Sequence, residues 1–161
     1  MAINFLSNIE FRFNIKRLPT VEFYIQEVTM PGINSGFAQH ATPFKILPRT
    51  GDKMEFEDLI LRCAVDEKMV SYTEVWNWLV SITNPTSFDQ RAALEASDDG
   101  IVSDATLMIL NSSKNPAIEV DFINLFPISV SSIQFDLKQT EQVPPVVDFT
   151  FKYDSYTFRD R

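Results

Sequence analysis

The segment from Val28 to Asn84 reads VTMPGINSGFAQHATPFKILPRTGDKMEFEDLILRCAVDEKMVSYTEVWNWLVSITN, and it decides the fold. It joins an extended stretch punctuated by prolines, a long strand and one Trp-bearing helix. Met30-Pro31-Gly32 predicts a type II turn, because Pro presets φ at one central position and Gly accepts a positive φ at the next. The segment holds no arrangement of residues typical of catalysis.

The residues after this turn form the least regular part of the segment. Residues 34–50 keep neither a helical nor a strand period, and Pro43 and Pro48 would interrupt any ladder they entered. A stretch of this length is expected to be disordered, to pack on its own domain or to dock on a partner. Its apolar content favours docking over disorder. The candidate inter-subunit residues on this arm are Phe37, His40, Phe44, Ile46 and Leu47.

The strand and helix that follow carry two local signals. Met54 and Phe56 share one parity, whereas Leu59 and Leu61 take the other, which predicts a β-bulge near Glu57-Asp58. Ser71-Tyr72-Thr73-Glu74 matches the capping box that begins a helix. Asn84-Pro85 would end this helix, since the residue before proline avoids helical geometry.

Two tryptophans lie on different faces of the predicted helix. Tyr72, Val75, Trp76, Leu79 and Ile82 recur at helical spacing and predict one buried stripe. Trp78 stands roughly 200° around the helix from Trp76 at 3.6 residues per turn. We therefore expect Trp76 in the core. Trp78 should be covered by the arm, by the polar loop after Pro85 or by a neighbouring subunit, and the last is favoured because aromatic anchors are common at interfaces.

Alternation of apolar and polar residues dominates the rest of the chain. It predicts strands at 11–16 and 21–26 joined as a hairpin, and further strands at 105–110, 117–122, 129–137 and 146–156. Residues 86–100 are polar and acidic and predict an exposed loop. The expected fold is mainly β: an antiparallel β-sandwich or barrel with one principal α-helix and an extended arm. We expect a single domain over 1–161, with the arm at about 30–52 and the exposed loop at about 85–102.

Composition limits the classes of function. Apolar residues make up 45% of the chain and the net charge is −8, which disfavours nucleic-acid binding through a basic patch. Cys63 stands alone, so no internal disulfide is expected. No apolar run is long enough for a membrane span, and the N-terminus lacks the pattern of a secretory signal. The sequence is typical of a soluble protein made in a reducing cytoplasm.

Motifs for catalysis, metals or cofactors are not found. His40 is the one histidine, so a zinc site of the Cys/His type is not expected, and no phosphate-binding glycine motif occurs. A pair among Glu55, Glu57, Asp58, Asp148 and Asp154 would be needed for a glycosidase. Glu55 and Glu57 fall on the solvent parity of their strand, which favours a solvated face over a catalytic cleft. We expect no enzyme and no cofactor; a carbohydrate-binding or peptide-binding β-sandwich is an alternative of another class.

The order of motifs resembles the tail tube proteins of contractile-tailed bacteriophages. The resemblance rests on Met30-Pro31-Gly32-Ile33, Gly51-Asp52 with Phe56 and Asp58, Asp66-Glu67 and the pair Trp76/Trp78. It implies subunits that form hexameric rings stacked head to tail, with strands from each subunit in a continuous inner barrel. Related tube proteins occur in type VI secretion and contractile injection systems.

The resemblance also implies partners and a location. These are a surrounding tail sheath, baseplate and tail terminator proteins, and DNA that passes through the lumen without specific binding. The protein itself is not expected to insert into a membrane. The protein would be assembled in the host cytoplasm and lie in the virion tail. A tube-like baseplate or adaptor protein that initiates or caps the tube is the alternative within the class. Carboxylates facing the lumen would repel DNA phosphates; the candidates are Glu55, Glu57, Glu119, Asp121, Asp148 and Asp154.

Overall fold

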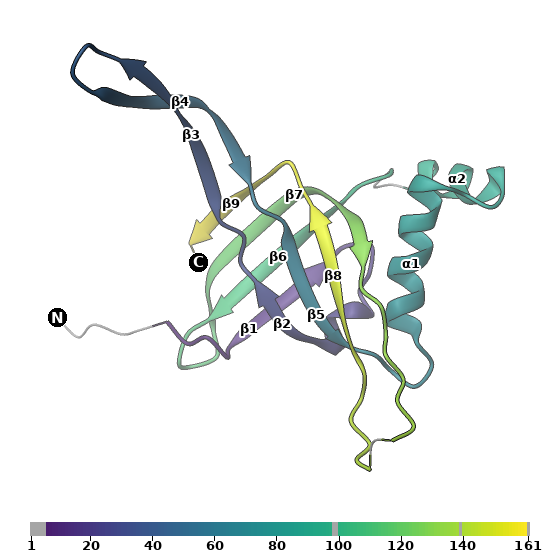
Figure 1. The fold of residues 1–161 in the computed structure, drawn as a ribbon. Coiled ribbons are helices and arrows are strands. Elements are labelled where there is room, and N and C mark those ends of the chain that lie inside the picture. The colour runs from purple at the N-terminus through teal and green to yellow at the C-terminus, as the bar shows by residue number, and fades with distance from the viewer. Residues whose placement is uncertain (1–5, 98–99, 139, 161) are drawn as a thin grey trace.

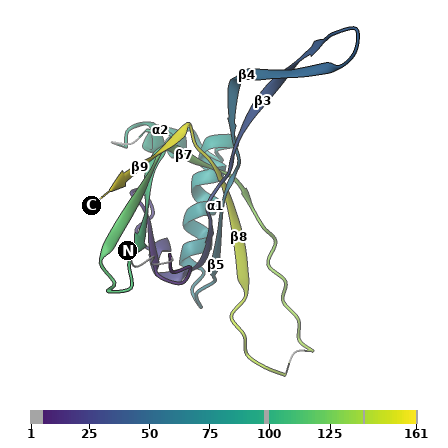
Figure 2. The same ribbon diagram turned by 90° about the vertical axis from the view of Figure 1, so that its left-hand side faces the viewer.

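The protein is built mainly from antiparallel strands, with helices on one side and two projecting segments at opposite ends (Figures 1 and 2). A computed structural model describes residues 6–97, 100–138 and 140–160. The strands are β1 Phe11–Ile15, β2 Ile25–Thr29, β3 Ile33–Ala41, β4 Ile46–Phe56, β5 Leu59–Ala64, β6 Ser103–Leu110, β7 Pro116–Val130, β8 Val146–Lys152 and β9 Ser155–Asp160. The helices are α1 Val70–Thr83, α2 Phe88–Glu95 and the 3-10 helix η1 Val21–Tyr24.

One long strand, β7, belongs to both layers of the sandwich. Its first part pairs with β6 on one side and β9 on the other, while Phe126–Val130 pairs with β8. The sheet with the strand order β1-β6-β7-β8-β5-β2 therefore bends at β7, where one layer passes into the other. Asn124 has φ 56° between the two parts, and the register shifts at Pro127. Such irregularities let a strand turn the corner between two packed sheets.

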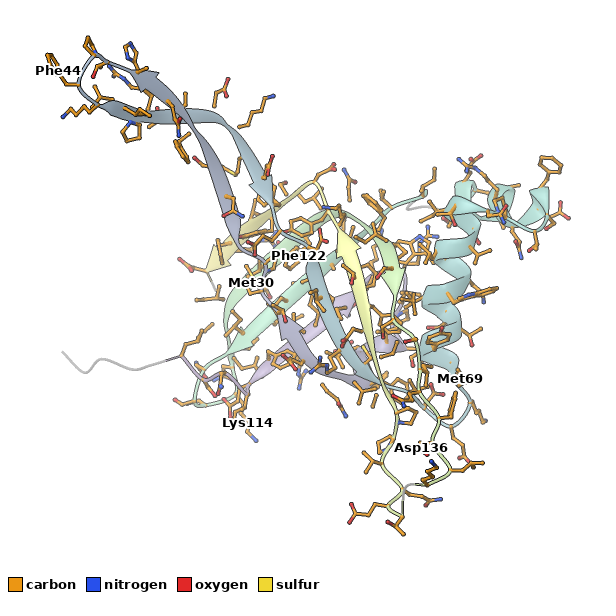
Figure 3. All side chains as sticks on the ribbon, in the orientation of Figure 1. Met30, Phe44, Met69, Lys114, Phe122 and Asp136 are labelled. Atoms are coloured by element: carbon orange, nitrogen blue, oxygen red, sulfur yellow. The ribbon has the colours of Figure 1, made fainter. Side chains whose placement is uncertain are left out.

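The core lies between the layers and follows the predicted alternation. On β5 and β8 every second residue is buried, and the register places Leu59 opposite Phe151 and Leu61 opposite Phe149. Phe13 from β1 and Phe122 from β7 meet at 6.2 Å between ring centroids (Phe122 is labelled in Figure 3). The expected mainly β antiparallel sandwich is confirmed.

Several predicted strand boundaries are wrong. Residues 21–24 form η1 rather than a strand, and β1 pairs with β6 while β2 pairs with β5, so the expected hairpin over 11–26 does not form. The predicted strands 117–122 and 129–137 are not separate: one strand, β7, runs from Pro116 to Val130, and residues 131–137 lie outside it. The predicted strand 146–156 is broken at Tyr153-Asp154 into β8 and β9.

The change of parity near Glu57-Asp58 is a strand break and not a bulge. β4 ends at Phe56 and pairs with β3, whereas β5 begins at Leu59 and pairs with β2 and β8. Because the two strands belong to different sheets, their apolar residues have no common face to keep.

Helix α1 begins without the predicted capping box. Its backbone N–H groups at Val70 and Ser71 donate to the Asp66 carboxylate at 3.1 and 3.3 Å, and Met69 takes a left-handed conformation before the first turn. Ser71 lies inside the helix, fully buried, and its hydroxyl also contacts Asp66. The capping residue thus stands several positions upstream of the predicted one.

A second helix occupies part of the predicted loop. Residues 88–95 form α2, in which Arg91 pairs with Glu95 at 2.9 Å, one turn along the helix. The loop prediction is wrong for these residues. Part of that prediction also falls on residues 98–99, which lie outside the described residues.

Candidate assembly surface

The arm is a β-hairpin that stands away from the sandwich (Figures 1 and 2). β3 and β4 pair only with each other, in register from Ile33 opposite Phe56 to Ala41 opposite Ile46. Every residue of β3 is exposed. The expectation of a segment without strand structure is wrong, because cross-strand hydrogen bonds stabilise the hairpin where side-chain alternation has no core to follow.

The tip of the hairpin is closed by a compact turn. The Thr42 backbone N–H donates to the Lys45 carbonyl at 2.9 Å, and the Lys45 N–H donates to the Thr42 hydroxyl at 3.2 Å. This turn presents Phe44, which is 97% exposed, at the far end of the molecule (Figure 3). A large apolar ring this exposed suits a contact surface rather than a solvated loop.

The structure brings the predicted arm residues together on the hairpin. Phe37 and Ile46 are more than half exposed, His40 lies on the exposed strand β3, and Leu47 is partly covered. All of them belong to the distal part of β3–β4, beyond Gly36 and Gly51. Their role between subunits stays a prediction.

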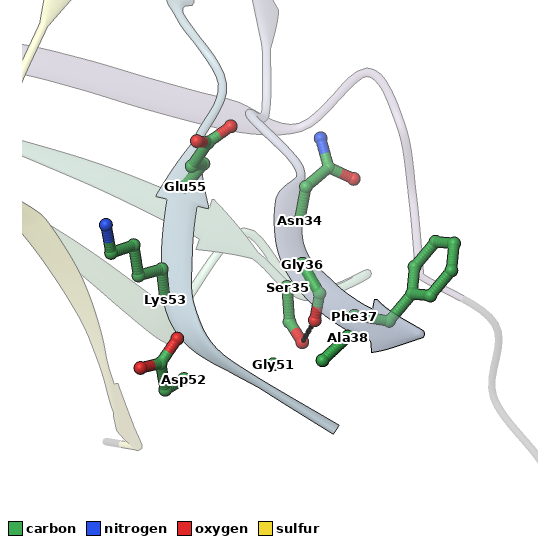
Figure 4. Close-up of a pocket in the computed structure, with 9 residues that line it drawn as sticks. All are labelled: Asn34, Ser35, Gly36, Phe37, Ala38, Gly51, Asp52, Lys53 and Glu55. Atoms are coloured by element: carbon green, nitrogen blue, oxygen red, sulfur yellow. Dashed lines mark hydrogen bonds between the residues drawn. The ribbon is translucent and has the colours of Figure 1, made fainter. Parts of the chain in front are cut away.

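Two glycines meet where the hairpin changes register. A Cβ atom added to Gly51 would collide with the Gly36 carbonyl oxygen, whereas one added to Gly36 would have nothing within 4 Å. The register shifts between Ser35 and Phe37 at the same place. Figure 4 shows this junction, where Asn34 and Glu55 lie on one side of the glycines and Phe37 on the other. The close approach of the two backbones therefore requires glycine at 51.

The Met30-Pro31-Gly32 motif fixes the base of the hairpin, and it is not the predicted type II turn. Gly32 is not among the described residues with a positive φ. Its N–H donates to the Glu57 carboxylate at 3.2 Å, and its carbonyl accepts from the Glu57 N–H at 3.0 Å. Tyr156 donates from its hydroxyl to the Pro31 carbonyl at 3.3 Å. The motif thus holds the two strands where they leave the sandwich.

Aromatic packing supports the same base. Phe56 packs edge-on against Tyr153 and Tyr156, with centroid distances of 5.7 and 5.6 Å. The Tyr153 hydroxyl donates to the Glu57 carbonyl at 2.9 Å, and burial raises the pKa of Tyr153 to about 12. The phenol therefore keeps its proton and this hydrogen bond throughout the neutral range. Sequence reasoning missed this anchor because its parts lie far apart along the chain.

The two tryptophans are placed opposite to the prediction. Trp78 is 3% exposed and donates its indole N–H to the Ile101 carbonyl at 3.0 Å, while Trp76 is 47% exposed. The Arg17 guanidinium lies over the Trp78 ring, 5.3 Å from its centroid. The buried stripe of α1 runs through Ser71, Val75 and Trp78, so Trp78 belongs to the subunit's own core. The predicted stripe holds for Val75, which is fully buried, and for Tyr72 and Ile82, which pack partly buried against the core, but it is wrong for Trp76.

The six acidic candidates come from several elements, and Glu119 is only 4% exposed, so its expected place on a solvated face is wrong. Glu55 lies on the hairpin and Glu57 at its base, and Asp154 lies in the β8–β9 turn. Glu119 and Asp121 belong to the part of β7 that pairs with β6 and β9, whereas Asp148 belongs to β8. Their proposed position along a lumen stays a prediction.

Several of these carboxylates are paired. Asp121 contacts Arg159 at 2.7 Å and accepts from the Thr106 hydroxyl at 2.9 Å. Asp148 contacts Arg62 at 2.9 Å, and Arg62 also reaches Glu27. The outer faces of both layers therefore carry mixed charge.

Open strand edges form a second feature suited to assembly. β1 pairs on one side with β6, β2 with β5, and β9 with β7, so each lies at an edge of the described sheets. Edge strands keep hydrogen-bonding groups that a neighbouring chain can pair with.

Among the described residues, no group of three or more His, Cys, Asp or Glu side chains is placed to hold a metal ion. In the part of the chain that the structure describes, no helix is both long and apolar enough to cross a membrane.

Solved structures from the anti-feeding prophage and from an extracellular contractile injection system share this fold. A chain of the anti-feeding prophage tube-terminating cap aligns with a TM-score of 0.70 at 15% identity, covering 100% of this chain and 95% of that one. A chain of the anti-feeding prophage baseplate gives 0.67 at 13%, covering 99% and 98%. A chain of the PVC sheath–tube complex in the extended state gives 0.62 at 14%, covering 97% and 92%. At these identities the likeness shows the fold.

The family follows from a direct match of the sequence. The model of the phage tail tube protein family matches residues 3–159, which is nearly the whole chain. The chain belongs to this family, as its motifs suggested. A comparison with curated proteins gave no match.

Proposed function

We propose that this protein is the structural subunit of an inner tail tube, built from stacked hexameric rings through which DNA passes to the host. The observation that carries the proposal is the β3–β4 hairpin, which exposes Phe37, Phe44 and Ile46 on an arm away from the sandwich. Family membership and the open edges of β1, β2 and β9 support it. Edges that pair under a rotation that closes give a ring, and the arm supplies a second contact for stacking.

The proposal includes the partners and location expected of a tube. They are a surrounding sheath, baseplate and terminator proteins, assembly in the host cytoplasm and a place in the virion tail. Likeness to chains from a sheath–tube complex and from a sheath/tube terminator supports these partners. Catalytic activity is not part of the proposed role.

Electron microscopy of the purified protein at high concentration tests this function. We expect rings with sixfold symmetry that stack into hollow tubes, with sedimentation velocity showing species far larger than 18.5 kDa. A protein that stays monomeric at every concentration would contradict the proposal.

A tube-like cap or baseplate adaptor is the second candidate. Chains from a tube-terminating cap and from a baseplate share the fold over nearly their whole length. A cap or adaptor would form single rings that do not elongate. Tube growth from purified protein alone separates the two functions.

A further inference from the structure

The two projecting segments carry complementary surfaces at opposite ends of the molecule. In both ribbon views the β3–β4 hairpin leaves one end and the β7–β8 loop, residues 131–145, leaves the other (Figures 1 and 2). Figure 3 places Phe44 at the tip of the first and Asp136 within the second. Stacking copies head to tail along the line that joins these two ends would bring the ends against each other.

The hairpin tip is apolar and basic. Residues 36–51 include Lys45 and Arg49 but no Asp or Glu, in a protein of net charge −8. Lys45 follows the exposed ring of Phe44 directly, and the Thr42–Lys45 turn fixes both. The tip therefore has the opposite charge to the chain as a whole.

The cavity of the β7–β8 loop has an apolar and acidic lining, while the exposed Lys138 lies in the same loop outside that lining. The two limbs of the loop enclose this open cavity of about 480 Å³, lined in part by Phe135 and Val143 and by the acids Asp136 and Glu141. Its described lining includes no Lys or Arg. Phe135 is 76% exposed and Val143 64%, so apolar surface faces solvent here too.

This loop is joined to the sandwich at both ends. The Val65 N–H donates to the Pro145 carbonyl at 2.9 Å, and the Ser131 N–H donates to the Asp148 carbonyl at 2.9 Å. Within the loop, the Lys138 backbone N–H donates to the Asp136 carboxylate at 2.9 Å. Both ends of the loop are therefore attached to the core.

We propose that the hairpin tip of one copy docks in the β7–β8 loop cavity of a second copy. Phe44 fills the space beside Phe135 and Val143, and Lys45 pairs with Glu141 at its rim. Burying an exposed aromatic ring gives affinity, while the ion pair fixes the orientation of the tip. This contact rests on the proposed stacking function and names the residues through which the copies join.

A charge swap tests the contact. Lys45→Glu and Glu141→Lys should each raise the protein concentration needed for tube formation about tenfold, because each puts like charges together. The double variant should restore assembly close to that of the wild type. Glu141 is chosen because the Asp136 carboxylate already accepts a hydrogen bond within its own loop. Lys114→Glu, in an exposed turn outside both segments, is the control for net charge.

Cross-linking gives a second readout. Phe44→Cys combined with Val143→Cys should form disulfides between copies and give a ladder of multimers on a non-reducing gel. Burial raises the pKa of the Cys63 thiol to about 12, so this native cysteine should stay inert. Either cysteine variant alone should give no ladder beyond a dimer.

The outcomes separate the two proposals. This contact would be overturned if the wild type forms tubes and Lys45→Glu forms them equally well. It would also be overturned if the double cysteine variant forms tubes without a cross-link between positions 44 and 143. Either result would leave the tube function standing. A wild-type protein that never assembles would overturn both.

Discussion

At the scale of single residues, Trp78 shows how a wrongly predicted side-chain position changes the role expected of that residue. Its ring packs beside Phe151 at 6.2 Å and under Arg17, and its N–H has a partner in the Ile101 carbonyl. An indole placed in this way stabilises the subunit and offers nothing to a neighbour. Trp76, with almost half its surface exposed, remains available for contacts outside the subunit.

Truncation of the two tryptophans should separate these roles. Trp78→Ala should lower the free energy of unfolding by about 3–5 kcal/mol, the usual cost of removing a large buried aromatic side chain. Trp76→Ala should cost about 1 kcal/mol or less, as is usual for exposed positions. Urea unfolding of dilute protein, followed by circular dichroism, measures both. Equal losses for the two variants would contradict this placement.

Asp66 gives a prediction about pH. Burial alone would raise its pKa, but hydrogen bonds from the Val70 and Ser71 N–H groups and the Ser71 hydroxyl outweigh it and lower the pKa. A carboxyl group with a lowered pKa in the folded state stabilises the fold above its unfolded pKa of about 3.9 and loses this effect as the pH falls. Asp66→Ala should therefore reduce the melting temperature at pH 7.

The difference in melting temperature between the wild type and Asp66→Ala should shrink in acid. Melting curves of wild type and Asp66→Ala should begin to converge as the pH drops below about 4 and should meet below the lowered pKa of the native carboxyl group. Glu67→Ala, at the exposed neighbouring position, serves as the control. A difference that persists unchanged to low pH would mean that the carboxylate charge does not matter at this helix end.

At the scale of elements, the hairpin depends on the junction of Gly36 and Gly51. Gly51→Ala would place a Cβ atom against the Gly36 backbone and should distort the arm, while Gly36→Ala meets open space. We expect Gly51→Ala to raise the concentration for tube formation about tenfold, equivalent to about 1.4 kcal/mol, with unchanged melting of the sandwich. Sedimentation and calorimetry test this, and equal effects of the two alanines would contradict it.

Sequence patterns predicted those elements that have one buried face. Alternation located most strands of the sandwich, since each must point every second side chain inward. The hairpin was missed because both of its faces are exposed, and Pro48 can lie opposite Gln39 at the edge of a two-stranded ladder. α2 was missed for a similar reason: its only buried residue is Leu94.

The candidate site was predicted only in part. Exposed apolar residues between prolines indicated the contact surface on the arm. The anchor at its base joins Gly32, Glu57 and Tyr156, which no local pattern connects. The acidic loop cavity was likewise not predicted, because residues 131–137 alternate as a strand would but have no partner strand.

At the scale of the whole molecule, the sandwich and the hairpin should be separable. A variant that lacks Ala38–Arg49, with Phe37 joined to Thr50 through an Asn-Gly turn, keeps the pairing of the remaining arm. It should melt within a few degrees of the wild type, since it loses no buried core residue. Electron microscopy should show no tubes. Normal tubes from this variant would mean that the arm is dispensable for stacking.

The pairing pattern has a consequence for the order of events during synthesis. β1 needs β6 as its partner, with Phe11 opposite Ile109, and β5 needs β8, whereas β3 and β4 are neighbours along the chain. A hairpin forms in about 1–10 μs, while ribosomes add only about 5–20 residues per second. The arm can thus begin to form seconds before the sandwich is complete, and because an isolated two-stranded hairpin is only marginally stable in water, it displays Phe44 on the unfinished chain for part of that time. Crowded ribosomes on one message would bring such tips together early, so rapid expression should favour aggregation that slower translation avoids.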